Sequence, residues 1–256
     1  MQNYTVGIVT YVERFEKWFK PLLRTIKEQR PNVEIIVCIN GEHNKEFNQD
    51  YRRDILEYIA KFNNVFPIMM TTHRSLSKLW NNLLINASNN ILVRLNDHLI
   101  IPNDSFWTKI ETSIRDSDGR SFKINGSWSH TVLNRREIES VGWFDERYLG
   151  AGEEDGDMEW RWAEGHGQEF LNISGFPIDN NWNNVDFEKC LVNLRKYNGK
   201  RSLFNREFNY KKYERDDDHG VAHGMMYAGG KKLRCVLPTE NQYPYERFFW
   251  ENKDNL

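Results

Sequence analysis

Residues 91–102 read ILVRLNDHLIIP and contain the pattern that decides the fold. The stretch begins at Ile91 as a short apolar run rich in branched residues, which is typical of a buried strand. The run ends abruptly in three polar side chains, Asn96, Asp97 and His98. Open α/β sheets bind ligands beyond the carboxyl ends of their strands, so these side chains are predicted to lie at a binding edge.

Asp97 and His98 are also candidate metal ligands. Carboxylate and imidazole groups suit Mn²⁺ or Mg²⁺ far better than they suit a metal that seeks thiolates. The same residues fit a simple turn, in which Asn96 and Asp97 leave the strand and His98 closes the loop. These residues alone leave both interpretations open.

The composition of the 256-residue chain excludes several classes of protein. A net charge of −2 argues against general affinity for nucleic acid. No apolar run is long enough to span a bilayer, and the N-terminus lacks the pattern of a signal peptide. The three cysteines are few and widely spaced, so we expect a reducing compartment, the cytoplasm, without a disulfide framework or zinc cluster.

The N-terminal part of the chain has the pattern of a βαβ unit. Residues 4–11 form the first predicted strand and residues 33–39 the second, which ends at the turn signal Asn40-Gly41. Between them, residues 13–29 carry apolar side chains at helical spacing, and Pro21 must kink or restart the helix. A parallel sheet is therefore expected.

Alternating patterns continue to about residue 141 and predict an α/β fold, with a mostly parallel central sheet and helices on both faces. No stretch resembles a linker, so residues 1–256 are predicted to form a single domain with an irregular C-terminal segment. The further helices are expected at residues 50–61, 75–87, 106–114 and 135–141, and the further strands at 65–71 and 121–134.

Residues 150–162 read GAGEEDGDMEWRW and form a dense acidic cluster after glycine-rich backbone. Crowded carboxylates repel one another and raise the pKa of some members, which is tolerated where a base, an acid or a metal site is needed. Acidic residues also stabilise the N-terminus of a helix. We expect both roles: Asp157 and Glu159 begin a helix, while Glu154 and Asp155 face a cleft.

These motifs, in this order, resemble an inverting nucleotide-sugar glycosyltransferase of the GT-A fold, closest in character to family 2. The GAGEEDGDM segment is also similar to an acidic segment of galactosyltransferases. The resemblance covers about residues 4–165, and a later basic stretch resembles a common C-terminal feature of family 2. The segments that carry it are SLSKLWNNLL (75–84), LNDHLIIP (95–102), VGWFDERYLGAGEEDGDMEWR (141–161) and KRSLFNREFNYKK (200–212).

The resemblance implies a hexosyltransferase that takes its sugar from a nucleoside-diphosphate sugar, with UDP favoured. The family's Asp-x-Asp motif binds the donor and a divalent cation, Mn²⁺ or Mg²⁺, and Asp97 matches its last aspartate. Leu95 or Asn96 stands where the first aspartate is usual, and His98 matches a ligand position of some relatives. The family's catalytic base matches Asp155.

Further roles follow from the same resemblance. Glu154 would bind an acceptor hydroxyl or orient the base. The positions expected to contact the nucleotide are Thr10, Tyr11, Asn40, Lys78, Asn81, Asn96 and Asp97. The positions expected to form the acceptor site of a glycan are Trp128, His130, Trp143 and Glu154, although core packing also explains the tryptophans.

The C-terminal part contains two candidate features. His219 and His223 match histidines that complete the metal shell in many GT-A enzymes, and a solvated acidic loop is the alternative. A basic stretch could close over the diphosphate as a lid, or form a surface for an anionic glycan or membrane headgroups. The basic residues of that stretch are Arg201, Arg206, Lys211 and Lys212.

By family architecture, residues 1–100 would form the nucleotide-binding half, 101–170 the acceptor half and 171–256 a lid or extension. The resemblance suggests polysaccharide biosynthesis as the setting. Two alternatives stay open. A nucleotidyltransferase would need a glycine-rich loop after the first strand, which TYVERFEKW (10–18) lacks. A catalytically silent glycan- or nucleotide-binding protein on the same scaffold is the other.

Overall fold

The computed structural model describes residues 4–42, 48–149, 152–180, 203–214, 227–228, 231–232, 234–239 and 251–252. The chain divides into two compact units. The first unit comprises Met1–Arg74, Asn82–Glu137 and Leu171–Phe187, and the second comprises Ser75–Asn81, Ile138–Phe170 and Glu188–Leu256. The sequence predicted one domain with boundaries near residues 100 and 170, and those boundaries stay a prediction.

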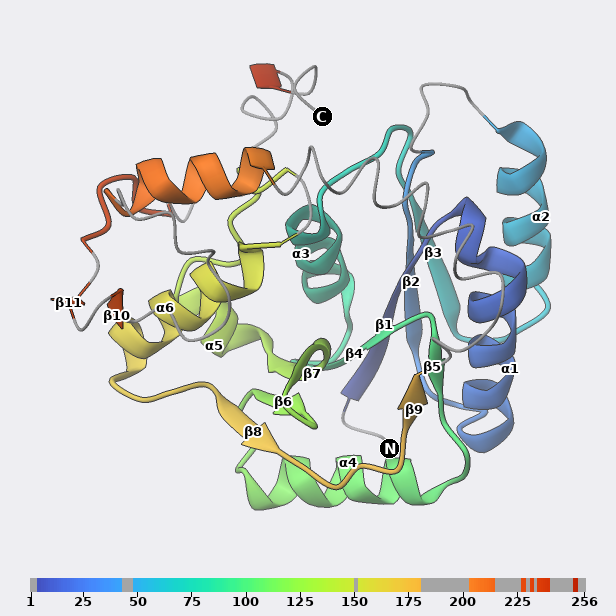
Figure 1. Ribbon diagram of the computed structural model, residues 1–256. Coiled ribbons are helices and arrows are strands. Elements are labelled where there is room, and N and C mark those ends of the chain that lie inside the picture. The colour runs from blue at the N-terminus through green and yellow to red at the C-terminus, as the bar shows by residue number, and fades with distance from the viewer. Residues whose placement is uncertain are drawn as a thin grey trace. The chain divides into compact units, whose positions relative to one another are not determined.

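The first unit is built on a seven-stranded sheet, which confirms the predicted α/β class (Figure 1). Neighbouring strands from β3 to β4 run parallel, whereas β7 is antiparallel to both of its neighbours and β8 runs parallel to β6. The strand order is β3 (Val65–Met69), β2 (Ile35–Ile39), β1 (Tyr4–Thr10), β4 (Ile91–Asn96), β7 (Ser127–Asn134), β6 (Phe122–Ile124) and β8 (Leu171–Ile173).

Helices cover both faces of this sheet. One core cluster joins inward residues of the strands to α1 (Lys20–Gln29), α2 (Gln49–Ile59) and α4 (Ser105–Asp116). On the other face, Leu83 of α3 (Leu76–Asn86) lies so close to β1 that a Cβ atom on Gly7 would be 3.1 Å from its Cδ1 atom. The glycine therefore permits a close approach of helix and strand.

The segment after β1 is not one continuous α-helix. A 3₁₀ turn, η1 (Val12–Arg14), leads into a π-helical turn, η2 (Phe15–Phe19), and α1 begins at Lys20. Pro21 lies in the first turn of α1, where its missing N–H costs nothing. The predicted restart at the proline is confirmed, and the irregular turns place Arg14 beside the end of β1.

The predicted single strand over residues 121–134 is wrong. This segment forms the antiparallel hairpin β6–β7, joined at Asn125-Gly126. Both turn residues have positive φ, 52° and 75°, as a tight hairpin turn with the right twist requires. The Asn-Gly pair is the sequence signal for such a turn, and the alternating pattern around it hid the reversal.

Two helices of the second unit and several short elements complete the described parts of the chain. The second unit contains α6 (Glu154–His166) and a helix over residues 203–212 that the sequence pattern did not predict. No helix in the described ranges has the length and apolar character needed to cross a membrane. The remaining elements are β5 (Leu99–Ile100), which pairs with β9 (Asp179–Asn180), α5 (Arg135–Ser140), and the pair β10 (Tyr227–Ala228) and β11 (Lys231–Lys232).

Candidate functional site

The carboxyl ends of β1 and β4 meet at one edge of the sheet. The two strands are parallel neighbours, and Val9 pairs with Asn96 in their register. Thr10 is therefore level with Asp97, and Tyr11 with His98. Thr10, the last residue of β1, is fully buried, so its predicted contact with the nucleotide stays a prediction.

Asp97 is held by an arginine that the sequence analysis did not single out. The Asp97 side chain has 0% exposure, and its Oδ1 atom accepts a hydrogen bond from Arg14 Nη1 at 2.9 Å. Its Oδ2 atom is buried and accepts no hydrogen bond from the described residues. One oxygen of the carboxylate is thus paired with a cation, and the other is buried without a hydrogen-bond donor among the described residues.

Two aromatic rings fix the Arg14 guanidinium. Its Nε donates to the Tyr11 hydroxyl oxygen at 2.6 Å, and its Cζ lies 4.7 Å from the Tyr11 ring centroid and 4.9 Å from that of Trp18. Burial acts to lower the pKa of Arg14, but the Asp97 carboxylate and Tyr11 outweigh it and raise that pKa above its ordinary value. Arg14 is therefore a permanent cation in a fixed position.

The two histidines of this edge lie next to Arg14 and Asp97. His98 Nδ1 is 3.5 Å from Arg14 Nη1 and 3.8 Å from Asp97 Oδ1. His130 of β7 accepts a hydrogen bond from the Asn96 backbone N–H at 3.4 Å, and its ring centroid is 6.1 Å from that of His98. The structure thus brings the predicted acceptor residue His130 beside the predicted donor motif.

The described residues do not form a divalent metal site around Asp97. They contain no group of three or more His, Cys, Asp or Glu side chains placed to share a metal ion. The cation Arg14 already binds Asp97 Oδ1 and lies beside the His98 ring nitrogen. Two unit charges roughly 4 Å apart interact by about 4 kcal/mol at an effective dielectric constant of about 20, and this repulsion doubles for a divalent ion.

The end of β2 is occupied by a loop clamp. Asn40 Oδ1 accepts from the Arg74 backbone N–H at 2.8 Å, and its Nδ2 donates to the Arg74 carbonyl at 3.0 Å. A Cβ atom on Gly41 would overlap the Thr72 backbone, so only glycine permits this approach. Both ends of the Asn40 amide therefore bind the Arg74 backbone, and the predicted contact of Asn40 with the nucleotide stays a prediction.

Lys78 and Asn81 of the second unit contact the segment that precedes the acidic cluster. Asn81 Nδ2 donates to the Phe144 carbonyl at 2.9 Å and to Glu146 Oε1 at 3.0 Å, while its Oδ1 accepts from the Phe144 N–H. Lys78 Nζ lies 3.4 Å from Glu146 Oε2. Both side chains are buried, so they tie α3 to residues 144–146, and their predicted nucleotide contacts stay predictions.

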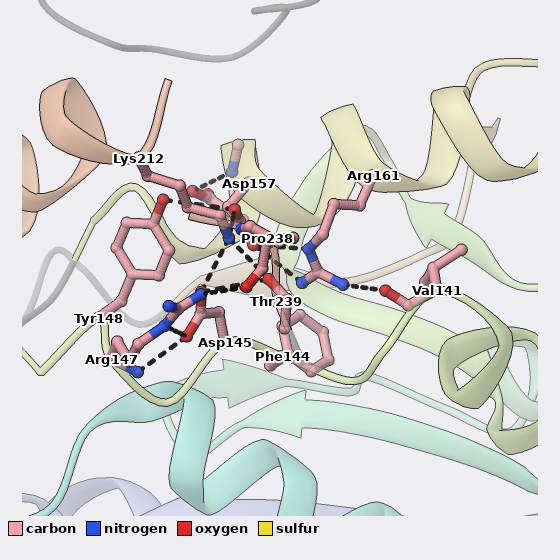
Figure 2. Close-up of polar contacts among 12 residues, drawn as sticks. Val141, Phe144, Asp145, Arg147, Tyr148, Asp157, Arg161, Lys212, Pro238 and Thr239 are labelled. Atoms are coloured by element: carbon pink, nitrogen blue, oxygen red, sulfur yellow. Dashed lines mark hydrogen bonds and ion pairs between the residues drawn. The ribbon is translucent and has the colours of Figure 1, made fainter. Parts of the chain in front are cut away.

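A fully buried lysine connects the acidic segment to the helix at residues 203–212. Figure 2 shows Lys212 Nζ between Asp145 and Asp157; it donates to Asp145 Oδ2 at 2.8 Å, to Asp157 Oδ1 and to Thr239 Oγ1 at 2.7 Å. The expectation that Lys212 belongs to a lid or a basic surface is wrong, because its side chain has 0% exposure. An unpaired ammonium group could not be buried in this way.

Arginines complete this network. Arg147 Nη2 lies 2.8 Å from Asp145 Oδ2, and Arg161 Nη2 lies 2.8 Å from Asp157 Oδ2 (Figure 2). Burial acts to raise the pKa of Asp145, but Lys212 and then Arg147 hold it well below its usual range. Burial likewise acts against the charge of Asp157, whose pKa is nevertheless lowered by Arg161 and Lys212. Both carboxylates are ionised and structural.

The network supports the turn that presents Glu154 and Asp155. These two residues begin α6, and Glu153 before them has a left-handed φ of 76°. Two asparagines of the 203–212 helix hold this turn: Asn205 Nδ2 donates to the Gly152 carbonyl at 2.6 Å, and Asn209 Nδ2 to Glu153 Oε2 at 3.2 Å.

Glu154 is buried, whereas Asp155 is half-buried and caps the Gly156 N–H through Oδ1 at 2.9 Å. Both residues belong to the first turn of the helix, as Asp157 does. The prediction that the helix begins at Asp157 is therefore wrong, because α6 already begins at Glu154. The catalytic roles of Glu154 and Asp155 stay predictions.

The other predicted site residues are placed as follows. Trp128 is buried in β7 and Trp143 is half-buried with a φ of 63°. Arg206 is half-buried and Lys211 exposed on the 203–212 helix. His219, His223 and Arg201 lie outside the described residues.

Sequence reasoning missed Arg14, Asn205 and Asn209. Arg14 had a signal, because a basic residue just after the first strand of an α/β sheet follows the carboxyl end of that strand. The asparagines had none, because their partners are backbone and side-chain atoms more than fifty positions away.

No protein-family model and no curated protein sequence matches this chain. Solved structures do. TarS of S. aureus aligns with a TM-score of 0.54 at 13% identity, over 83% of this chain and 44% of that one. The mannosyltransferase PcManGT of Pyrobaculum calidifontis, described with GDP-Man and Mn²⁺, has a TM-score of 0.58 at 12% identity, over 80% of this chain and 64% of that one.

A third structure is the glucosyl-3-phosphoglycerate synthase of Mycobacterium tuberculosis with Mn²⁺, UDP and phosphoglyceric acid. Its TM-score is 0.52 at 12% identity, and the alignment covers 78% of each chain. This chain spans less than two thirds of the length of TarS and of PcManGT. The similar structures are nucleotide-sugar glycosyltransferases of the GT-A type, and the likeness shows that this chain has the GT-A fold.

Proposed function

We propose that the protein is an inverting glycosyltransferase that moves a sugar from a nucleoside-diphosphate sugar, with UDP favoured, to a hydroxyl of a glycan. The observation that carries the proposal is the polar edge formed by Tyr11, Arg14, Asp97 and His98. It lies at the carboxyl ends of parallel strands of a GT-A sheet, where such folds bind ligands. A buried carboxylate there, with one oxygen that accepts no hydrogen bond from the described residues, needs a functional reason.

In the proposed reaction Asp155 is the general base. The acceptor hydroxyl oxygen forms a bond to the anomeric carbon of the donor while its proton passes to the Asp155 carboxylate. The bond between that carbon and the diphosphate oxygen breaks, and the electron pair leaves with the nucleoside diphosphate. Attack from the side opposite the leaving group inverts the anomeric configuration. Glu154 orients the base or binds the acceptor.

Supporting observations come from the turn before α6. The Asn205 and Asn209 contacts, together with the Lys212 network, hold the backbone at residues 152–154 in place. Catalytic groups act efficiently when their supporting shell fixes them. A protein that bound a glycan without reacting with it would not need a half-buried carboxylate held in this way.

The acceptor is proposed to contact His130 and the tryptophans at positions 128 and 143. Aromatic faces stack well on the apolar faces of sugars, and Trp143 is half-buried. An acceptor carried by a lipid or a surface polysaccharide, a setting in polysaccharide biosynthesis and a cytoplasmic location remain part of this proposal by analogy to the fold.

A divalent cation is the usual companion of such donors, and Mn²⁺ accompanies the nucleotide in two of the similar structures. In this chain a Mn²⁺ ion would need donors beyond Asp97 and His98, such as His219 or His223. The positive charge of Arg14, which already contacts Asp97, offers an alternative to that ion.

The test is a panel of nucleotide sugars incubated with the protein, with and without Mn²⁺. We expect release of free nucleoside diphosphate from one donor, lowered by about 10²- to 10⁴-fold in Asp155→Asn, because a positioned base contributes a factor of that size. Glu164→Gln, an exposed carboxylate on the same helix, is the matched control and should retain full rate.

Two outcomes would contradict the proposal. Donor binding without turnover, unchanged by Asp155→Asn, would identify a catalytically silent binding protein. Release of pyrophosphate from a nucleoside triphosphate would identify a nucleotidyltransferase.

A further inference from the structure

The cation at the candidate donor site belongs to the protein itself. Arg14 follows β1 and Asp97 follows β4, so the parallel pairing of these strands brings the two side chains to one edge. Three contacts then define the guanidinium: Asp97 Oδ1 at 2.9 Å, the Tyr11 hydroxyl at 2.6 Å and the Trp18 ring at 4.9 Å. These contacts hold a positive charge in a fixed position.

The guanidinium retains binding capacity. Its Nε atom donates to Tyr11 and its Nη1 atom to Asp97, but Nη2 donates to no described residue. The Arg14 side chain is 16% exposed. A guanidinium matches phosphate oxygens with parallel N–H donors, and its charge survives at any physiological pH. Asp97 holds this arginine through a hydrogen bond from Nη1.

Resting on the proposed function, we propose that Arg14 binds the diphosphate of the nucleotide sugar and takes the place of the divalent cation. As the bond between the anomeric carbon and the diphosphate oxygen breaks, the electron pair and the growing negative charge reside on the diphosphate. Arg14 donates hydrogen bonds to it and stabilises that charge. Asp97, Tyr11 and Trp18 are positioning residues, which hold the arginine.

The structural alternative is an ion pair that only stabilises the fold. Arg30 offers a matched control, because it also pairs with an aspartate, Asp104, and lies 5.9 Å from a tryptophan ring, that of Trp107. Arg30 precedes β2, at the opposite end of the parallel strands. Arg30→Gln should therefore affect stability without affecting nucleotide binding.

The experiment measures UDP and GDP binding to the full-length protein by calorimetry, in EDTA and in Mn²⁺. We expect the wild-type protein to bind one nucleotide equally well under both conditions. In EDTA, Arg14→Gln should weaken that binding by roughly 10- to 100-fold, the loss typical of a hydrogen bond between charged groups. Arg30→Gln should leave the affinity unchanged.

Mn²⁺ binding gives a readout independent of activity. Removing the guanidinium removes the positive charge beside Asp97 and His98, so electron paramagnetic resonance should show that Arg14→Ala binds Mn²⁺ at least about tenfold more tightly than the wild-type protein. A tight Mn²⁺ site in the wild-type protein that Asp97→Asn abolishes would overturn the inference.

The remaining outcomes separate the two proposals. Nucleotide binding that requires Mn²⁺ in the wild-type protein would contradict the role of Arg14 and leave the proposed function standing. Unchanged nucleotide affinity in folded Arg14→Gln would also contradict it and show a structural ion pair. No binding of either nucleotide under both conditions would contradict the proposed function and the inference together. The comparison of nucleotide binding in EDTA and in Mn²⁺ uses only the wild-type protein, so it tests the inference even if Arg14→Gln does not fold.

Discussion

At the scale of single residues, the carboxylates at positions 145–157 lie in different environments. Asp145 and Asp157 are fully buried and share the ammonium group of Lys212. Asp155 is half-buried, and its Oδ1 atom accepts a hydrogen bond from the Gly156 N–H of its own helix. Sequence crowding suggested that this cluster held functional acids. Only the pairing of the buried members with distant cations shows which carboxylates are structural.

Lys212→Met tests the structural role of Asp145 and Asp157. Removing the ammonium group that Asp145 and Asp157 share leaves two buried carboxylates with one arginine each, so we expect the free energy of unfolding at neutral pH to fall by about 3–5 kcal/mol. The matched control Lys211→Met alters the exposed neighbour and should change stability by less than about 0.5 kcal/mol. Chemical denaturation of both variants measures the effect.

The same network sets the dependence on pH. Lys212, Arg147 and Arg161 lower the folded-state pKa values of Asp145 and Asp157, so the stabilisation is present above the unfolded pKa of about 3.9 and is lost as the pH falls toward the folded values. The stability gap between wild type and Lys212→Met should therefore narrow below about pH 4. A gap that stays constant from neutral to acid pH would show that packing, not charge, explains the loss.

At the scale of elements, local sequence signals predicted the strands and helices of the first unit well. The apolar run at Ile91–Asn96 and the restart at Pro21 follow from short-range chemistry. The hairpin at Asn125-Gly126 was misjudged, because alternation continues through a two-residue turn. The helix at residues 203–212 was missed, because its buried Lys212 and asparagines make it read as a polar segment.

Gly41 tests the clamp at the end of β2. A Cβ atom there would lie 2.6 Å from the His73 nitrogen and overlap the Thr72 backbone, which cannot move without breaking the Asn40–Arg74 hydrogen bonds. Gly41→Ala should therefore destabilise the protein by about 1–3 kcal/mol or more.

Gly7→Ala is the matched control for that prediction. Its Cβ atom would meet only the side-chain ends of Leu92 and Leu83, at 3.0 and 3.1 Å, and these can shift. Thermal unfolding should show a smaller loss of stability in Gly7→Ala than in Gly41→Ala. An equal or larger loss in Gly7→Ala would contradict the account of the clamp.

At the scale of the whole molecule, the sequence was sufficient for the α/β class and for the GT-A resemblance, which the similar structures confirm as a fold. It placed Asp97 at a strand end correctly. It could not show that Arg14 binds this aspartate, because the contact depends on an irregular 3₁₀ and π-helical segment between β1 and α1. The expectation of a metal came from the motif alone, and the contact between Arg14 and Asp97 is the observation behind the proposal that Arg14 takes its place.

The central claim is that one donor sugar is bound through its diphosphate by Arg14 and attacked by an acceptor that Asp155 deprotonates. A crystal structure of the protein with its nucleotide sugar, grown in EDTA, tests this most directly. We predict diphosphate oxygens about 3 Å from the Arg14 guanidinium, with the anomeric carbon facing Asp155. A diphosphate bound away from Arg14, or an Asp155 carboxylate turned from the sugar, would contradict the account.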